Sequence, residues 1–243
     1  MRIMTVPCLK DNYAYLIAAD GACAVVDPSE PGPVLAALQR EGLKLTHILN
    51  THHHGDHTGG NLGLKDMTGA LVVGPEKDSH RIPGIDIGVG EKDGWEFAGA
   101  KVRVLEVPAH TLGAITFVMD GNAFTGDTLF VMGCGRLFEG DAAMMHASLA
   151  KLKALPDTTR IWCGHEYAAS NGRFALTLEP GNAALAARVR ALQTPSVPAT
   201  MADEKATNPF LREDTAEIRK TLGMEREDAV SVFAEIRRRK DVF

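Results

Sequence analysis

The stretch LNTHHHGDHTGG, residues 49–60, constrains this chain more than any other feature. It places four of the nine histidines and an aspartate within six positions. The preceding run KLTHILN is apolar and typical of a strand, so the stretch begins extended. In an extended chain His52, His54 and Asp56 project to one side. His53 projects to the other side. Two imidazoles on one side of a strand end can bind one metal ion.

A second ion is indicated by the position of His57. The glycines of TGGN follow this residue and allow the backbone to turn sharply, so its imidazole can reach an ion beside Asp56. The alternative is a polar surface loop that is rich in histidine by chance. A pattern of this length disfavours that alternative far more than a bare HxH would. The spacing therefore predicts two neighbouring metal sites.

Three later residues also follow apolar strand-like runs. His110 follows KVRVLEVPA, Asp127 follows NAFTG, and His165 follows RIWCG. Each alone is weak evidence, because a lone histidine is more often structural and an aspartate after glycine is usually a turn residue. Functional loops collect at one edge of a sheet, so together the three predict a single site with the first cluster. Asp27 ends the strand-like run AVVD and is either an ordinary turn residue or a carboxylate that orients a ligand histidine.

Short β-rich runs dominate the first two thirds of the chain, and helical spacing dominates the rest. Strands that alternate with a few helices in this order predict the α/β class with mixed sheets. The strand pattern disappears after about residue 170, which predicts a first domain over residues 1–170 and a helical domain over 171–243. The predicted strands are 2–6, 13–19, 22–27, 44–50, 70–74, 101–107, 114–119, 122–127 and 160–164. The predicted helices are 33–42, 141–155, 182–192, 215–223 and 226–240.

Composition excludes several classes of protein. A hydrophobic content of 45% supports a sizeable core, and no apolar run approaches the ~20 residues that a membrane span needs. No basic patch interleaved with aromatics suggests nucleic-acid binding. The four cysteines are widely spaced without a CxxC pair, which predicts buried thiols. We expect a soluble, cytoplasmic monomer.

Four motifs together resemble those of a known superfamily. THHHGDH, PAHT, TGDTLF and GHEY, in that order, are similar to the metal-binding motifs of the metallo-β-lactamase superfamily. KDNYAYLI, GCGRLFEG, NPFLR and RRRKDVF resemble the glyoxalase II branch, the hydroxyacylglutathione hydrolases. The resemblance extends from residue 10 to residue 243. It implies an αββα sandwich of two mixed sheets, followed by a smaller all-helical C-terminal domain.

The resemblance also implies a ligand set for two divalent ions. It assigns His52, His54 and His110 to the first ion, assigns Asp56, His57 and His165 to the second, and makes Asp127 the bridge. Five imidazoles and two carboxylates suit zinc, iron or manganese. We take zinc as the first candidate. In this scheme Asp56 and Asp127 act in catalysis by holding a metal-bridging hydroxide, which is the nucleophile, and no GxSxG motif suggests a serine nucleophile.

The implied reaction is hydrolysis of S-(2-hydroxyacyl)glutathione, with S-D-lactoylglutathione giving D-lactate and glutathione. In the family this is the second step of methylglyoxal detoxification. The positions that match the family's glutathione contacts are Arg136, Phe138, Tyr167, Arg237 and Lys240. Phe138 stands where some relatives carry tyrosine, so one hydrogen bond to the tripeptide is expected to be missing. The RRRK segment, 237–240, has an alternative interpretation as a solvated helix end whose cations complement the helix dipole.

Two other functions are compatible with parts of this pattern. A persulfide dioxygenase of the same superfamily would be an oxidoreductase with a single iron. The complete set for a second metal and the long helical tail argue against it. A noncatalytic protein that keeps the metal cage for structure is the other alternative, and a basic substrate patch beside seven intact ligands disfavours it.

Overall fold

The first part of the chain forms a six-stranded mixed sheet in the computed structural model, which describes residues 1–243. The strand order is β1-β2-β3-β4-β5-β6. β1, β2 and β3 pair antiparallel, and β3 to β6 pair parallel. The strands are β1 (Arg2–Cys8), β2 (Asn12–Ala19), β3 (Ala22–Val26), β4 (His47–Leu49), β5 (Leu71–Pro75) and β6 (Ile85–Val89).

A second six-stranded mixed sheet has the order β14-β13-β10-β9-β8-β7. Its only parallel pair is β10 with β13. A separate hairpin, β11 with β12, follows β10 directly. The strands are β7 (Trp95–Phe97), β8 (Ala100–Glu106), β9 (Ile115–Met119), β10 (Asn122–Gly126), β11 (Leu129–Phe130), β12 (Gly133–Cys134), β13 (Arg160–Cys163) and β14 (Ala199–Thr200).

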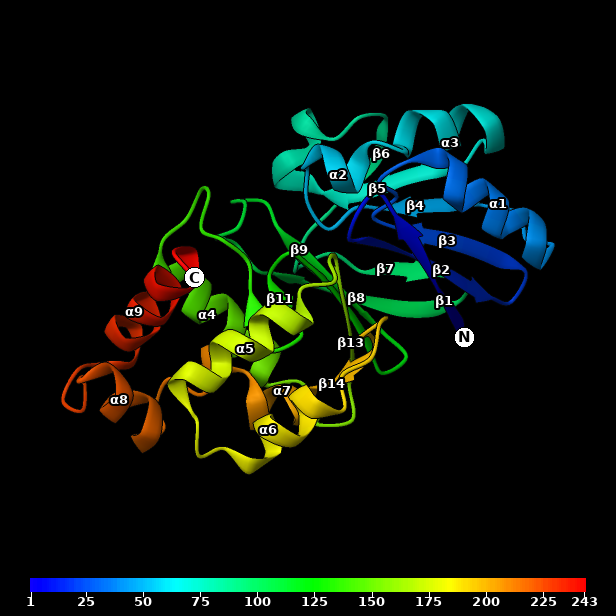
Figure 1. Ribbon diagram of the computed structural model, residues 1–243. Coiled ribbons are helices and arrows are strands. Elements are labelled where there is room, and N and C mark those ends of the chain that lie inside the picture. The colour runs from blue at the N-terminus through cyan, green and yellow to red at the C-terminus, as the bar shows by residue number, and fades with distance from the viewer.

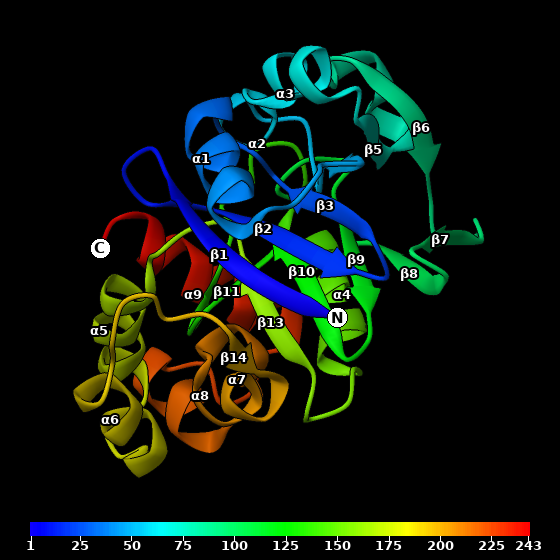
Figure 2. The ribbon, with the colours of Figure 1, turned by 90° about the vertical axis from the view of Figure 1, so that its right-hand side faces the viewer.

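Helices cover the outside of the first sheet and gather at the C-terminal end of the chain. Figures 1 and 2 show α1 and α3 together over the first sheet, and α5 to α9 clustered on the other side of the molecule. α4 packs against α9, which joins the C-terminal helices to the rest. The helices are α1 (Pro31–Glu41), α2 (Gly55–Thr58), α3 (Asn61–Thr68), η1 (Glu76–Arg81), α4 (Ala142–Lys153), α5 (Ala168–Leu178), α6 (Ala183–Arg190), α7 (Met201–Thr207), η2 (Pro209–Leu211), α8 (Ala216–Leu222) and α9 (Ala229–Asp241).

Side-chain alternation in the first sheet divides the apolar residues between two cores. In β2, Tyr15 and Ile17 belong to the larger core, which also contains residues of the second sheet. Leu16 lies between them in sequence and belongs to a smaller core with Val34 of α1 and Leu64 of α3. This division follows from the period of two in a strand. The larger core continues into the C-terminal helices.

The predicted α/β class with two mixed sheets is confirmed, and every predicted strand and helix is present. The C-terminal region is helical except for β14, whose two residues extend the second sheet beside β13. No strand was predicted there, because two residues are too few for an alternating pattern. No helix is both long and apolar enough to cross a membrane.

The candidate ligands follow strands that end at a common edge. β10 and β13 are parallel with Gly126 opposite Cys163, so the segments after them leave the sheet together. β8 runs in the same direction as β10, because both are antiparallel to β9. The two sheets are joined at this edge by backbone hydrogen bonds, from Ile115 N to Thr51 O and from Tyr13 N to Gly164 O. This edge positions the candidate metal ligands.

Candidate metal centre

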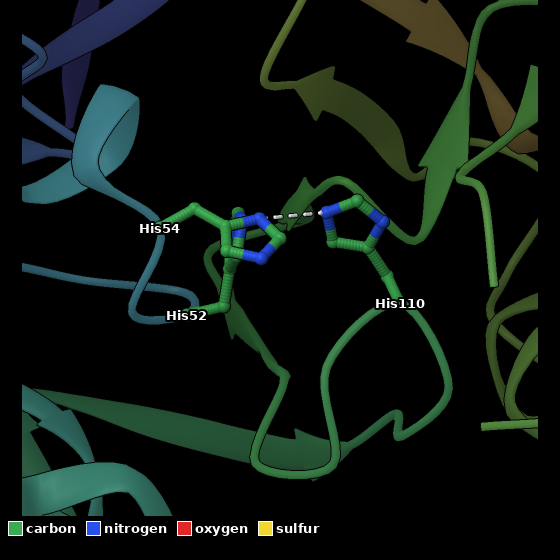
Figure 3. A group of neighbouring side chains, drawn as sticks. All are labelled: His52, His54 and His110. Carbon is green, nitrogen blue, oxygen red and sulfur yellow. Dashed lines mark hydrogen bonds between the residues drawn. The ribbon is translucent and has the colours of Figure 1, made fainter. Parts of the chain in front are cut away.

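Three imidazoles form the first half of the site. His54 Nδ1 lies 3.2 Å from His52 Nε2 and 3.1 Å from His110 Nε2. Figure 3 shows the three rings converging from the loop after β4 and the loop after β8. His52 and His110 are buried. Because an unprotonated imidazole nitrogen is a metal ligand, three imidazoles that converge in this way suit a metal ion.

Two imidazoles and a carboxylate form the second half. His165 Nε2 lies 3.3 Å from His57 Nε2 and 3.3 Å from Asp56 Oδ2. The extended conformation predicted through Asp56 is wrong, because the chain becomes helical at Gly55, where α2 begins. That turn places Asp56 and His57, which are consecutive, beside the same partner.

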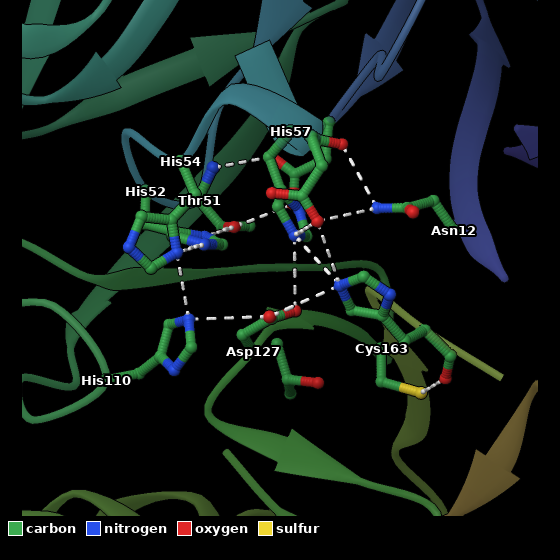
Figure 4. Close-up of polar contacts among 12 residues, drawn as sticks. Asn12, Thr51, His52, His54, His57, His110, Asp127 and Cys163 are labelled. Carbon is green, nitrogen blue, oxygen red and sulfur yellow. Dashed lines mark hydrogen bonds and ion pairs between the residues drawn. The ribbon is translucent and has the colours of Figure 1, made fainter. Parts of the chain in front are cut away.

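Asp127 lies between the two groups and contacts both. Its Oδ2 atom is 3.4 Å from His110 Nε2 and 3.3 Å from His165 Nε2, and its Oδ1 atom is 3.3 Å from His57 Nε2. Figure 4 shows this carboxylate at the centre of the cluster. Asp127 is only 8% exposed, and its Oδ1 atom has no hydrogen-bond partner by standard geometry. A buried oxygen in this state fits a bound cation.

The nitrogens of His57 and His110 that face away from the centre are bonded to other groups. His57 Nδ1 lies 3.1 Å from Asp27 Oδ2, and Asp27 also accepts from Thr51 N at 2.8 Å. His110 Nδ1 lies 2.9 Å from Arg136 O. These contacts orient the opposite nitrogen of each ring toward the centre. Of the two interpretations of Asp27, the structure therefore supports the orienting one. His53 faces away, as expected, with Nδ1 3.1 Å from Asp78 Oδ2.

Two residues of the segment KDNYAYLI support the second half, and sequence reasoning gave neither of them a role. Asp11 Oδ1 lies 2.9 Å from His165 Nδ1. Asn12 Nδ2 donates to Asp56 Oδ2 at 3.1 Å. Asp11 precedes His165 by 154 positions, so no local pattern connects them. The only signal was the resemblance of this segment to the family motif.

The ionisable groups balance one another's charge. Burial would raise the pKa of Asp127, but the neighbouring His57 and His165 hold it well below its usual range. Burial would lower the pKa of His165, but Asp127 and Asp56 raise it to about 10. Burial and neighbouring imidazoles keep the pKa of His52 well below its usual value. Without metal, protons on His165 and His57 therefore balance the carboxylates, and metal ions must displace those protons.

A cleft of about 470 Å³ opens on this centre. Asp127 and His110 form part of its wall, and Lys240 and Phe243 of the C-terminal region form another part. Tyr167 stacks on His165 with ring centroids 4.9 Å apart. The five predicted substrate contacts all line this cleft, namely Arg136, Phe138, Tyr167, Arg237 and Lys240. The fold thus brings them together, although their binding role stays a prediction.

The RRRK segment divides into inward and outward residues. Arg237 is 4% exposed, and its Nη atoms contact Cys134 O at 2.9 Å and Asp241 Oδ1 at 2.8 Å. Lys240 Nζ donates to Ser170 Oγ at 3.0 Å and lies over the Phe243 ring. Arg238 and Arg239 instead pair with Glu235 on the outside of α9. The solvated-end interpretation therefore describes only these two arginines.

All four cysteines are buried and free, as predicted. Burial raises the pKa of the Cys134 thiol to about 11 and that of the Cys163 thiol to about 12. Both thiols are therefore protonated at neutral pH, and neither has the character of a nucleophile.

Comparisons with known proteins agree with this geometry. The family model for the metallo-beta-lactamase superfamily matches residues 10–165, and the model for the hydroxyacylglutathione hydrolase C-terminus matches residues 166–243. A hydroxyacylglutathione hydrolase from Methylococcus capsulatus is 53% identical over 100% of this chain and 99% of its own length. Another, from Rhodospirillum rubrum, is 52% identical over 97% of this chain and 96% of its own length. This chain belongs to the hydroxyacylglutathione hydrolase family.

Two solved structures resemble the fold of this chain. ETHE1 from Myxococcus xanthus matches with a TM-score of 0.69 and 25% identity over 98% of each chain. TTHA1623, solved in a di-iron-bound form, matches with a TM-score of 0.62 and 26% identity over 87% of this chain and 100% of its own. Membership of the superfamily and the cluster of histidines and aspartates together support the use of divalent metal by this chain.

Gly164 provides a test of how closely the centre is packed. A Cβ atom at this position would overlap Asp127 Oδ1 and lie 2.6 Å from His57 Cε1. We expect Gly164→Ala to weaken metal affinity roughly 10- to 100-fold, as does loss of an orienting contact. Gly55→Ala is the control, because a Cβ there meets no atom within 4 Å. Metal competition with a chromophoric chelator measures both variants, and equal affinity in both would contradict the packing described.

Proposed function

We propose that this member of the hydroxyacylglutathione hydrolase family cleaves S-(2-hydroxyacyl)glutathione, with S-D-lactoylglutathione as the main substrate. The products are D-lactate and glutathione. One observation carries the proposal. The cleft beside Asp127 is bounded on its far side by cationic residues of the C-terminal region, so a metal centre and a candidate anion-binding wall share one space. The names of the relatives from Methylococcus and Rhodospirillum agree with this substrate.

We further propose that the centre binds two divalent ions, with zinc as the first candidate and iron or manganese as alternatives. The His52, His54 and His110 group would bind one ion, and the Asp56, His57 and His165 group the other. Asp127 would bridge them. The relative that was solved in a di-iron-bound form supports the number of ions and keeps iron among the candidates. Such ions supply a nucleophile from water near neutral pH and polarise the acyl carbonyl.

Residues of the chain itself position the substrate, and the two candidate carboxylate ligands stay negatively charged. Asp56 and Asp127 remain ionised, since neighbouring imidazoles lower the pKa of both carboxyls. The leaving thiolate has a solution pKa of about 8.5, so it departs without a strong general acid. Tyr167, stacked on His165, lies where the tripeptide would pass from the centre toward Lys240.

The glutathione carboxylates would meet the cationic side of the cleft. Arg136 has an exposed side chain, and Lys240 has a half-buried ammonium, so both can reach a ligand. Arg237 already contacts Asp241 and the Cys134 carbonyl, so part of its effect on substrate binding would pass through these two groups. Phe138 would contribute an apolar ring only. In this scheme the domain over residues 1–170 carries the chemistry, and the helical domain over 171–243 contributes to glutathione binding.

A single chain supplies every residue of this scheme, which supports a monomer as the working unit. Four free buried thiols suit the reducing cytoplasm. The persulfide dioxygenase and the noncatalytic alternative are not favoured. The complete second group of candidate ligands argues against a single iron, and the open cleft argues against a purely structural cage.

A steady-state assay with S-D-lactoylglutathione, combined with metal analysis of the same preparation, tests the proposal. We expect turnover that disappears with a strong chelator and returns when metal is added. Oxygen consumption with glutathione persulfide, measured in parallel, tests the dioxygenase. Turnover of the persulfide without hydrolysis of the thioester would overturn the proposed function.

Loss of the bridging carboxylate should disturb both metal sites. We expect Asp127→Ala to bind fewer than two ions per chain and to lose at least roughly 10³-fold in kcat/KM, because the carboxylate contacts both groups. Asp120→Ala is the control, because Asp120 contacts only the N-terminal amine among charged groups. Elemental analysis and the hydrolysis assay measure both variants. Full metal content and activity in Asp127→Ala would refute the bridging role.

The reaction should not depend on a cysteine nucleophile. We expect Cys134→Ala and Cys163→Ala to keep kcat within about tenfold of the parent, because burial keeps both thiols protonated. His54→Ala should lose several orders of magnitude, roughly 10³-fold or more. An acyl group trapped covalently on either cysteine, found by mass spectrometry of the quenched enzyme, would contradict this prediction.

Lys240 should make substrate binding depend on pH. Burial, reinforced by Arg237, Arg173 and Arg136, lowers the pKa of this ammonium to about 8 in the free protein. It is charged below that pH and neutral above it. We therefore expect KM for lactoylglutathione to rise as pH increases through about 8, while kcat changes little, because these contacts are far from the scissile bond.

Two substitutions at Lys240 isolate this effect. Lys240→Arg keeps its charge at all these pH values and should flatten the KM profile. Lys240→Met should raise KM roughly tenfold below pH 8, a value reduced for solvent screening of a half-exposed group. An unchanged rise in KM above pH 8 in the Met variant would assign the titration to another group.

A further inference from the structure

The segment NPFLR, residues 208–212, has no part in the proposed chemistry, yet its first residue is fully buried. Asn208 Nδ2 lies 3.2 Å from Phe130 O and 3.0 Å from Gly133 O, the two residues at either end of the β11–β12 turn. Its Oδ1 atom accepts from Phe210 N at 3.1 Å, which fixes the orientation of the amide. Asn208 therefore joins the C-terminal region to the β11–β12 hairpin.

Two further C-terminal side chains bond the residues between those ends. Asn171 of α5 donates from Nδ2 to Val131 O at 3.1 Å. Glu204 of α7 accepts from Met132 N through Oε2 at 2.9 Å, and the same oxygen accepts from Asn208 Nδ2 at 2.9 Å. Each of the four residues from 130 to 133 thus has a backbone polar group bonded by Asn171, Glu204 or Asn208. We name these three residues the hairpin clamp.

The clamp includes a charge whose burial needs compensation. Glu204 is 0% exposed, and its Oε1 atom pairs with Arg188 Nη2 at 2.7 Å. The attraction within a buried ion pair offsets only part of the desolvation free energy that its burial costs. A buried ion pair is therefore weak evidence for stability. Met132, whose N–H meets Glu204, has φ of 56°, a conformation that disfavours side chains other than glycine. The buried charge of Glu204 and the positive φ of Met132 both indicate that the surrounding residues impose the backbone conformation of the hairpin.

Both ends of the clamped hairpin lie at the metal centre. β11 begins two residues after Asp127, and Gly135 N donates to Thr128 O at 3.2 Å just beyond β12. The next residue, Arg136, presents the carbonyl that lies 2.9 Å from His110 Nδ1. The shape of the hairpin therefore determines both the position of Asp127 and the orientation of the His110 ring.

We propose that Asn171, Glu204 and Asn208 are positioning residues for the metal centre. Through the hairpin, the C-terminal helices fix the bridging carboxylate and one imidazole, besides any contact that they make with glutathione. This inference rests on the proposed function, which it deepens by giving the C-terminal region a role in the chemical step. A region that served glutathione binding alone would affect KM and leave kcat and metal affinity unchanged.

A small neutral thioester separates the two roles, because it makes no use of a glutathione pocket. We expect Asn208→Ala to lower kcat on the order of 10- to 100-fold with both the neutral thioester and lactoylglutathione, since small displacements at a reacting centre have effects of this size. Metal loss to a chelator, followed optically without substrate, should reflect an affinity roughly 10- to 100-fold weaker.

A second variant disturbs the clamp from the hairpin side. A Cβ atom at Gly133 would overlap the Asn171 amide, so Gly133→Ala displaces the hairpin while every C-terminal side chain remains. It should reproduce the loss of kcat and the weaker metal binding. Asn182→Ala is the matched control, because Asn182 caps α6 and bonds Ala206 O without contact to the hairpin. It should lose some stability and keep both kcat and metal affinity.

The outcomes are distinguishable. Parental kcat on the neutral thioester and parental metal affinity in both Asn208→Ala and Gly133→Ala would overturn the clamp while leaving the hydrolase proposal intact. The same loss of metal in Asn182→Ala would also overturn it, because general destabilisation would then explain the effect. Failure of the parent to hydrolyse either thioester would reject the proposed function, and the metal measurements alone would still decide whether the clamp positions the centre.

Discussion

The buried carboxylate of Asp127 is the group on which the arrangement of the centre depends. It is 8% exposed and contacts His57, His110 and His165. A charge at this depth costs several kcal/mol unless cations surround it. The fold must therefore bring positive charge to one point, either as protons on imidazoles or as metal ions. A network of this kind changes its proton content when metal binds.

Strand geometry explains how residues from distant parts of the sequence reach that point. The parallel pairing of β10 with β13 places Asp127 beside His165, because Gly126 is opposite Cys163. Asp27 and Asp11 then hold rings whose backbone comes from other segments. Because the outer nitrogens of His57, His110 and His165 are already bonded, these rings need little motion when their inner nitrogens meet an ion. The centre is in this sense preorganised, which is the property that metal-dependent hydrolysis requires.

Much of this arrangement could be predicted from the sequence, for identifiable reasons. The histidine cluster has a short spacing that few structural roles explain, and its partners each follow an apolar strand, so their convergence at one edge was predictable. The helical turn at Gly55 was not, because four residues are too few for a periodic pattern. α5 was also missed. It contains Asn171 and Gly172, and a Cβ at Gly172 would lie 2.7 Å from Val189 Cγ2, so tertiary packing overrides local propensity there.

Sequence patterns do not predict contacts between residues that are far apart in the sequence. Asp11 with His165 and Asn208 with the β11–β12 turn depend on the assembled fold. The sequence also could not show that Arg237 is buried while its neighbour Arg238 is exposed, because both belong to one run of cations on α9. Residues that hold ligands in place are therefore harder to predict than the ligands themselves, since any polar residue type at any distance can serve.

The number and position of the bound ions can be measured by anomalous diffraction from crystals of the metal-loaded protein, collected on both sides of the absorption edge of the metal. We expect two peaks per chain. One should lie among His52, His54 and His110, the other among Asp56, His57 and His165, and the Asp127 carboxylate should contact both. A single peak in fully active protein, or a peak remote from Asp127, would contradict it.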